Sequence, residues 1–208
     1  MTTTSSIMEK FSGYPVFTNR DVRLFLGRKA KAANVARLLS HMKRAGRIHQ
    51  VVRGVYSATV DERVSGFAFQ PFYYGTLYAL TLRELWTQNS RPEIITLKKI
   101  RKSGILIFGG KVGVKLHHLT PKRFFGFDIL VVGGMKVPVS DPEKTLIDLF
   151  FYKIRLPIQD YSGLLKAVDR RKLASYLKAY DGHTRVAVEN FVRKYKRAAD
   201  AGKLESPY

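Results

Sequence analysis

Residues 18–57 read TNRDVRLFLGRKAKAANVARLLSHMKRAGRIHQVVRGVYS, and this stretch decides the fold of the amino-terminal end of the chain. Its first part predicts a short helix over residues 19–26. Thr18 is a favoured N-cap, and Asp21 three residues later completes a capping-box pattern. Gly27 predicts the end of this helix, because glycine readily adopts the backbone conformation that follows a last helical turn.

The second part of the stretch predicts a helix followed by a hairpin. Apolar residues recur every three or four positions over residues 31–45, which indicates a helix with one buried stripe. This stripe consists of Val35, Leu38, Leu39 and Met42. Residues 47–52 then alternate like a strand, Gly54 supplies a tight turn, and residues 55–57 return as a second strand. The order helix, turn, helix, hairpin predicts a winged helix-turn-helix over residues 1–60.

The second predicted helix places its polar residues opposite the apolar stripe. These residues lie three or four positions apart, so they form a ridge along the helix. A recognition helix in the major groove of DNA needs such side chains, because Asn and Arg make paired hydrogen bonds with base edges. The ridge consists of Lys31, Asn34, Arg37, His41 and Arg44. Arg44 lies near the end of the helix, where a cation also complements the helix dipole, and we favour that structural role for it.

Further cations flank the ridge. Arg28 and Lys29 precede the helix, where they are placed to meet phosphates, and Arg53 in the hairpin turn would reach a minor groove or a phosphate. A charged helix face is often simply solvated, and that interpretation stays open for the ridge taken alone. The ridge, the cations before it and the hairpin together favour binding to double-stranded DNA, with Asn34 and Arg37 as the candidates for base contacts.

The composition also favours a polyanionic partner. The 208 residues include 37 Lys and Arg against 16 Asp and Glu, a net charge of +21, and residues 1–60 hold 11 of these cations against 2 acids. Nucleic acid is the commonest partner of such a chain, and an anionic membrane surface is the rival. No apolar run approaches the ~20 residues that span a bilayer, and no signal-peptide pattern opens the sequence. The chain has no cysteine, which excludes disulfides and thiolate metal sites. We expect a cytoplasmic protein without a membrane partner.

After a polar link over residues 61–65, the pattern predicts a second domain over residues 66–208. A helix over residues 75–86 precedes short strands, and helices close the chain, an order typical of an α+β domain. The strands are expected over residues 93–97, 105–108, 112–117, 127–132 and 135–139, and the closing helices over residues 141–152, 161–180 (broken near Asp169) and 183–201. The predicted fold class is therefore α+β: a winged helix-turn-helix, then an α+β domain with a mixed sheet of short strands and carboxy-terminal helices.

The second domain contains carboxylates whose spacing does not fit catalysis. Nucleotidyltransferase chemistry needs paired carboxylates two residues apart on a strand, whereas Asp128 is followed by Ile129 and Leu130. Residues 141–144 (Asp-Pro-Glu-Lys) superficially resemble a nuclease cluster, but a helix start explains them better, with a cap, a first-turn proline and an acid at the positive end of the dipole. No pair of the five histidines has a supporting carboxylate at metal-ligand spacing. We therefore expect no enzymatic activity, no cofactor and no metal.

A basic cluster lies between two of the predicted strands. It would either line nucleic acid or form a solvated loop, and both interpretations stay open. The candidates for additional phosphate contacts are Lys98, Lys99, Arg101 and Lys102.

Three segments carry a family resemblance. They are RIHQVVRGVY at residues 47–56, YGTLYAL at residues 74–80 and VPVSDPEKTLIDL at residues 137–149. With these motifs the chain resembles, over about residues 10–155, the AbiEi-type antitoxins, the transcriptional-regulator half of bacterial abortive-infection toxin–antitoxin pairs. The Pro-Glu-Lys segment is the strongest single mark of the resemblance.

The resemblance implies a winged-helix domain that represses its own operon, at an operator or promoter with repeats, and a carboxy-terminal domain needed for antitoxicity. It also implies a functional partner, a nucleotidyltransferase-like toxin that is countered without a stable complex. The chain ends sooner after the Pro-Glu-Lys segment than many members of the family. A stand-alone transcriptional regulator, a metal-dependent nuclease and a general nucleic-acid coating protein remain as alternatives.

Overall fold

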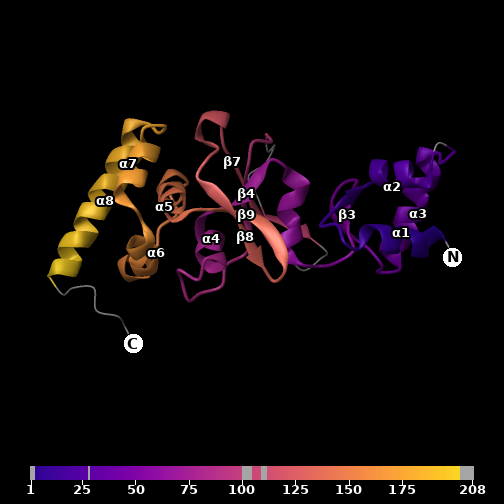
Figure 1. The fold of residues 1–208 in the computed structure, drawn as a ribbon, viewed down its shortest axis with the longest axis horizontal. Helices are drawn as coiled ribbons and strands as arrows, with labels where there is room; N and C mark the ends of the chain where they lie inside the picture. Colours follow the sequence, from indigo (N-terminus) through magenta and orange to yellow (C-terminus); the bar gives the residue numbers. More distant parts are fainter. Residues whose placement is uncertain (1–2, 28, 100–104, 109–111, 202–208) are drawn as a thin grey trace.

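The computed structural model of the chain describes residues 3–27, 29–99, 105–108 and 112–201, and it is an α+β structure. Its elements lie in a row: helices with a small sheet at the amino-terminal end, a larger sheet in the middle and the carboxy-terminal helices at the far end (Figure 1). We call residues 3–60 the amino-terminal region and residues 61–201 the carboxy-terminal region. None of the described helices combines the length and apolar character that crossing a membrane requires.

The amino-terminal region packs helices against a three-stranded antiparallel sheet of order β1-β3-β2. The helices are α1 (Thr3–Phe11), α2 (Asn19–Leu26) and α3 (Ala32–Arg44), and the strands are β1 (Phe17–Thr18), β2 (His49–Val52) and β3 (Val55–Ser57). The predicted order of helix, helix and hairpin is therefore present, with small shifts at the element ends.

Local sequence explains where these helices begin and end. The Thr18 N–H donates to the Asp21 carboxylate (2.7 Å), and the Asp21 N–H donates to the Thr18 hydroxyl (3.2 Å), so the predicted capping box is confirmed. After α3, Gly46 has a φ of 68°, and the next N–H, of Arg47, donates to the Met42 carbonyl (3.0 Å). The helices meet in a core that includes Ile7, Phe11, Phe17, Val22, Val35, Leu39, Met42 and Ile48.

The segment expected to be a polar link is instead folded. Residues Glu62–Phe69 form the 3-10 helix η1, in which Val64 and Ser65 are buried. The Arg63 guanidinium pairs with Asp61 (2.6 Å) and donates to the carbonyl of Val132 (2.7 Å), so polar residues in this stretch serve tertiary contacts. The polar composition of this stretch did not indicate these contacts, because the Val132 carbonyl that Arg63 binds lies 69 residues further along the chain.

The carboxy-terminal region is built on a six-stranded mixed sheet of order β6-β7-β5-β4-β9-β8. The pairs β4–β9 and β5–β7 are parallel, and the remaining neighbours are antiparallel. The strands are β4 (Phe72–Tyr74), β5 (Glu93–Thr96), β6 (Ile105–Phe108), β7 (Val112–His118), β8 (Phe127–Val132) and β9 (Met135–Ser140). Strand β8 is an edge of the sheet, and on it Ile129 and Val131 remain 59% and 67% exposed.

Two features of this region differ from the sequence prediction. Strand β4 was not expected, because its three aromatic residues are all buried and show no alternation of polar and apolar positions. Helix α4 (Thr76–Leu82) ends before residue 86, since Glu84 adopts a φ of 55° and the Leu85 N–H donates to the Leu80 carbonyl (2.9 Å).

Helices form the far end of the molecule beyond the sheet (Figure 1). They are α5 (Pro142–Phe151), α6 (Ser162–Ala167), α7 (Arg170–Leu177) and α8 (Gly182–Asp200), with the short turns η2 (Pro121–Arg123) and η3 (Ile158–Tyr161). The break predicted near Asp169 is confirmed. The Asp169 carboxylate accepts hydrogen bonds from the backbone N–H groups of Arg171 (2.7 Å) and Lys172 (2.9 Å), which starts α7 as a new helix.

A fully buried ion pair joins α5 to its neighbours. The Lys144 ammonium and the Asp148 carboxylate, one turn apart on α5, are inaccessible to solvent and bonded to each other. The Tyr73 hydroxyl donates to Asp148 (2.9 Å), and Lys144 donates to the Tyr180 hydroxyl (2.8 Å). Burial lowers the pKa of Lys144 and raises the pKa of Asp148, while the attraction between the two charges opposes both shifts. The pair therefore links β4, α5 and the segment after α7.

Replacing Asp148 by Leu leaves the buried Lys144 ammonium without a carboxylate. We expect the free energy of unfolding at pH 7 to fall by about 3–5 kcal/mol, measured by urea denaturation. The double variant Lys144→Met/Asp148→Leu removes both charges and is expected to recover part of that loss, because it still leaves the hydroxyls of Tyr73 and Tyr180 without these partners. Equal stability of Asp148→Leu and the wild type would contradict a central role for the pair.

Candidate nucleic-acid interface

The polar side of α3 is an exposed surface. Val35, Leu39 and Met42 are buried in the core and Leu38 is half-buried, as the spacing predicts. The side chains predicted to face away from this stripe are all exposed. We call the exposed set Lys31, Asn34, Arg37 and His41 the α3 ridge. Arg44 is exposed in the last turn of α3, beside the carbonyl groups that end the helix.

Among the described residues, no carboxylate pairs with the cations of this surface. Residues 1–60 contain only two acids, Glu9 and Asp21. The Asp21 carboxylate accepts hydrogen bonds from Thr18 at the start of α2. Within the described part of residues 3–60, no cation forms an ion pair. The positive charge of the amino-terminal region is therefore available to a partner.

The predicted flanking cations lie at two turns. Lys29, between α2 and α3, is exposed, and Arg53 is exposed at the tip of the β2–β3 hairpin, where Gly54 has a φ of 79°. Arg28 lies outside the described residues. The hairpin is tied to both helices, because the Asn19 N–H donates to the Gly54 carbonyl (3.4 Å) and Lys43 donates to Gln50 (2.9 Å). The structure thus presents the α3 ridge and the hairpin tip from one packed unit.

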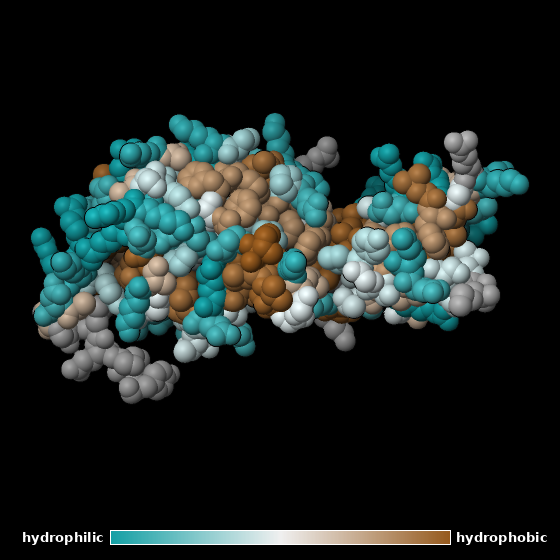
Figure 2. Space-filling view, viewed as in Figure 1, coloured by the Kyte–Doolittle hydropathy of each residue, from teal (hydrophilic) through white to brown (hydrophobic). Residues whose placement is uncertain are grey.

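The basic cluster of the second domain is only partly described. Lys98 is exposed, and its ammonium donates to the carbonyl of Ala68 (3.0 Å), so this charge has a structural contact. Lys99 is exposed, and Arg101 and Lys102 lie outside the described residues. Another cationic surface lies on α8, where the exposed residues include Arg193, Lys194, Lys196 and Arg197. Hydrophilic side chains cover much of the carboxy-terminal helices, whereas hydrophobic area shows over the middle of the molecule (Figure 2).

The carboxylates considered for catalysis have structural partners. Asp128 on the edge strand β8 pairs with Arg83, which also donates to the Ser140 carbonyl (2.6 Å). Asp141 caps α5 by accepting from the Lys144 N–H (2.8 Å), so the structural interpretation of residues 141–144 is confirmed. Among the residues that the structure describes, no three His, Asp or Glu side chains are grouped so that they would hold a metal ion.

Glu143 also makes structural contacts, which join α5 to α7. One of its carboxylate oxygens accepts from the Asp169 N–H (2.6 Å), and the other lies 3.0 Å from the ammonium of Lys172. Lys172 also meets Asp141 (3.0 Å), and these contacts raise its pKa against the opposing effect of burial. These residues attach α7 to the start of α5.

The sequence did not reveal a buried titratable pair between two strands. His117 Nε2 lies 2.6 Å from the Glu93 carboxylate, and Lys115 lies 3.4 Å from the same group. These residues are more than twenty positions apart and meet because β5 and β7 run parallel with Glu93 opposite Lys115. Burial alone would raise the pKa of Glu93, but the hydrogen bond with His117 and the charge of Lys115 hold it below its ordinary value of 4.5.

Comparison with known proteins gives a likeness of fold. No family model matches the chain, and no curated protein matches it. The crystal structure of the RV2827C protein from Mycobacterium tuberculosis is similar with a TM-score of 0.64 and 14% sequence identity, covering 100% of this chain and 83% of that chain. At this level of identity the likeness concerns the fold alone, and it extends over both regions of the chain.

The Glu93–His117 pair gives a prediction for acid stability. Because the pKa of Glu93 is lower in the folded than in the unfolded chain, its stabilising effect is present above about pH 4.5 and is lost as the pH falls through the folded value. We expect the free energy of unfolding to depend less steeply on pH in Glu93→Gln than in the wild type below about pH 5. Urea denaturation at several pH values measures this, and parallel curves would contradict it.

Proposed function

We propose that the amino-terminal region is a winged helix-turn-helix that binds double-stranded DNA, and that the chain is a transcriptional regulator rather than an enzyme. The α3 ridge carries this proposal. It is an exposed line of basic, amide and imidazole side chains on a helix whose opposite side is buried, and no carboxylate in the described part of the chain is bound to it. Because the described cations of this region form no ion pairs within the chain, the surface can bind a polyanion without first breaking such pairs.

In this proposal, α2 and α3 are the helix-turn-helix and the β2–β3 hairpin is the wing. Helix α3 enters the major groove, where Asn34 and Arg37 read base edges. The cations at the start of α3 and in the turn before it meet phosphates; they are Arg28, Lys29 and Lys31. His41 extends the ridge toward the end of the helix, and Arg53 at the wing tip reaches a phosphate or a minor groove.

The biological role rests on the resemblance to AbiEi-type antitoxins. The chain would act in the cytoplasm and repress its own operon by binding promoter repeats. It would counter a nucleotidyltransferase-like toxin without forming a stable complex with it. A nucleotidyltransferase-like reading frame next to the gene favours the antitoxin, whereas its absence favours a stand-alone regulator with the same DNA-binding domain.

Footprinting on the chain's own promoter tests the DNA-binding proposal. We expect protection of a defined segment by the wild type. Arg37→Ala is expected to weaken specific binding by about 1–3 kcal/mol and to relax discrimination at one base position. Lys10→Ala is the control, because Lys10 is an exposed cation of α1 and lies outside the α3 ridge and the hairpin. Equal losses in the two variants, or no protected segment, would overturn the assignment of α3.

The wing tip is expected to behave differently. Because Arg53 is placed to meet the DNA backbone, Arg53→Ala should weaken binding to specific and unrelated sequences alike. It should also reduce the slope of log affinity against log salt concentration by about 1. Titrations of labelled duplexes at several salt concentrations measure both effects. An unchanged slope would place Arg53 outside the interface.

A further inference from the structure

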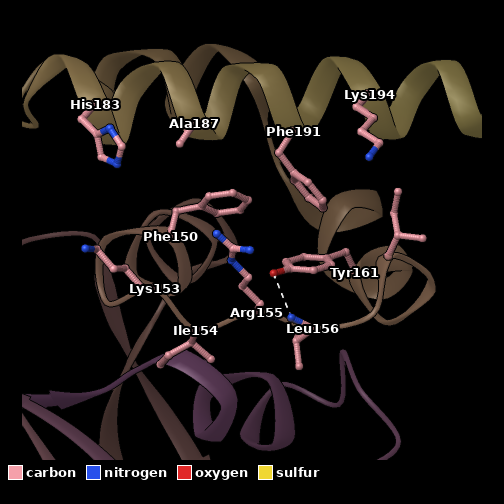
Figure 3. Close-up of a pocket in the computed structure, with 11 residues that line it drawn as sticks. Phe150, Lys153, Ile154, Arg155, Leu156, Tyr161, His183, Ala187, Phe191 and Lys194 are labelled. Atoms are coloured by element: carbon pink, nitrogen blue, oxygen red, sulfur yellow. Dashed lines mark hydrogen bonds between the residues drawn. The ribbon is translucent and has the colours of Figure 1, made fainter.

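A pocket lies among the carboxy-terminal helices, at the opposite end of the molecule from α3 (Figures 1 and 3). It opens between the end of α5, the segment that follows α5, and α8. Its volume is about 600 Å³, within the range of about 300–1,000 Å³ typical of small-molecule sites. The proposed DNA-binding function does not involve this pocket.

Aromatic rings form one wall of the pocket. The ring of Phe191 lies 5.0 Å from that of Phe150 and 4.5 Å from that of Tyr161, measured between ring centroids. Tyr161 is buried, whereas Phe150 and Phe191 are only half-buried. Partly uncovered aromatic rings offer a stacking surface to a planar ring.

Three cationic side chains and an imidazole surround these rings. The cations are Lys153, Arg155 and Lys194, the imidazole is that of His183, and all four side chains are exposed. The guanidinium of Arg155 points toward α8 and lies between Phe150 and Tyr161 (Figure 3). From the other side, His183 and Lys194 extend from α8 into the pocket (Figure 3). No Asp or Glu is among the described residues that line the pocket. Unopposed cations beside aromatic rings favour a ligand that carries both negative charge and a planar ring.

Lys153 has a left-handed backbone conformation at the end of α5. Lys153 follows the last turn of α5 with a φ of 57°, and the next N–H, of Ile154, donates back to the Leu149 carbonyl (2.8 Å). Glycine is the residue that this helix-ending position favours, because a side chain is disfavoured in the left-handed conformation. Lys153 thus lines the pocket from a position that glycine occupies with less strain, so Lys153→Gly removes the ammonium group without straining the turn.

We propose that this pocket binds a nucleoside phosphate. The base stacks on the ring of Phe191 or Phe150, and the phosphate oxygens accept hydrogen bonds from Arg155 and Lys153, with Lys194 adding charge from α8. The ligand is held far from the α3 ridge, so it does not compete directly with a duplex bound there.

Isothermal titration calorimetry with the full chain tests the ligand class. The probes are ATP, GTP, CTP and UTP, with tripolyphosphate as the control for charge alone and adenosine as the control for the ring alone. At least one nucleotide is expected to bind saturably at one site, and about tenfold or more tighter than either control. Absence of saturable binding both by millimolar nucleotide and by a 5′-phosphorylated oligonucleotide, or equal affinity for tripolyphosphate, would overturn the proposal.

Two variants test whether the nucleotide binds in this pocket. Arg155→Ala and Lys153→Gly are each expected to weaken nucleotide binding by about tenfold, whereas Lys178→Ala, an exposed cation outside the pocket, should leave it unchanged. Lys153→Gly also relieves the left-handed conformation, so its melting temperature is expected to equal or exceed that of the wild type. Loss of affinity without loss of stability supports the pocket, and unchanged affinity in both pocket variants contradicts it.

The 5′ end of a nucleic-acid strand carries the same two groups, a phosphate and a planar base. A short single-stranded oligonucleotide with a 5′-phosphate is therefore titrated in the Arg37→Ala background, which weakens the proposed duplex site. Binding of the oligonucleotide that is lost with Lys153→Gly, in the absence of nucleotide binding, would assign the pocket to a strand end. Binding of the free nucleotide alone would assign it to a small-molecule effector.

Discussion

Removing water from an ammonium and a carboxylate is costly, and the carboxy-terminal region does so at Lys144 and Asp148. The structure accommodates the pair because hydroxyl groups of Tyr73 and Tyr180 complete its hydrogen bonds. These tyrosines belong to β4 and to the segment after α7, so the pair is satisfied only when sheet and helices have met. The end of α5, which leads into the aromatic pocket, is positioned by the same constraint.

The two regions use their positive charge in different ways. In the carboxy-terminal region several cations meet carboxylates: Arg83 pairs with Asp128, Arg123 with Asp181, and Lys172 with two acids of the α5 start. In the described part of the amino-terminal region, no cation forms such a pair. The positive charge there is not offset by carboxylates in the described residues, and this contrast is the physical basis for proposing a polyanionic partner at α3.

Local signals in the sequence predicted the amino-terminal elements well, because a cap such as Thr18, a glycine such as Gly46 and a regular apolar stripe act over a few residues. Contacts between distant residues were not predictable in this way. Strand β4 has no alternation, since both of its faces are buried, and Glu93 meets His117 only through the parallel register of two strands. The aromatic pocket likewise combines residues of α5, of the following segment and of α8, whose spacing in sequence carries no periodic signal.

The edge strand β8 has a consequence for handling the protein. Its unpaired backbone groups, beside the exposed Ile129 and Val131, form a template for pairing with another copy of the chain. The net charge of +21 keeps copies apart by long-range repulsion. Added salt shortens the reach of that repulsion without covering the strand. The protein is therefore expected to aggregate more readily as the ionic strength rises, and it is best concentrated in a buffer of low ionic strength.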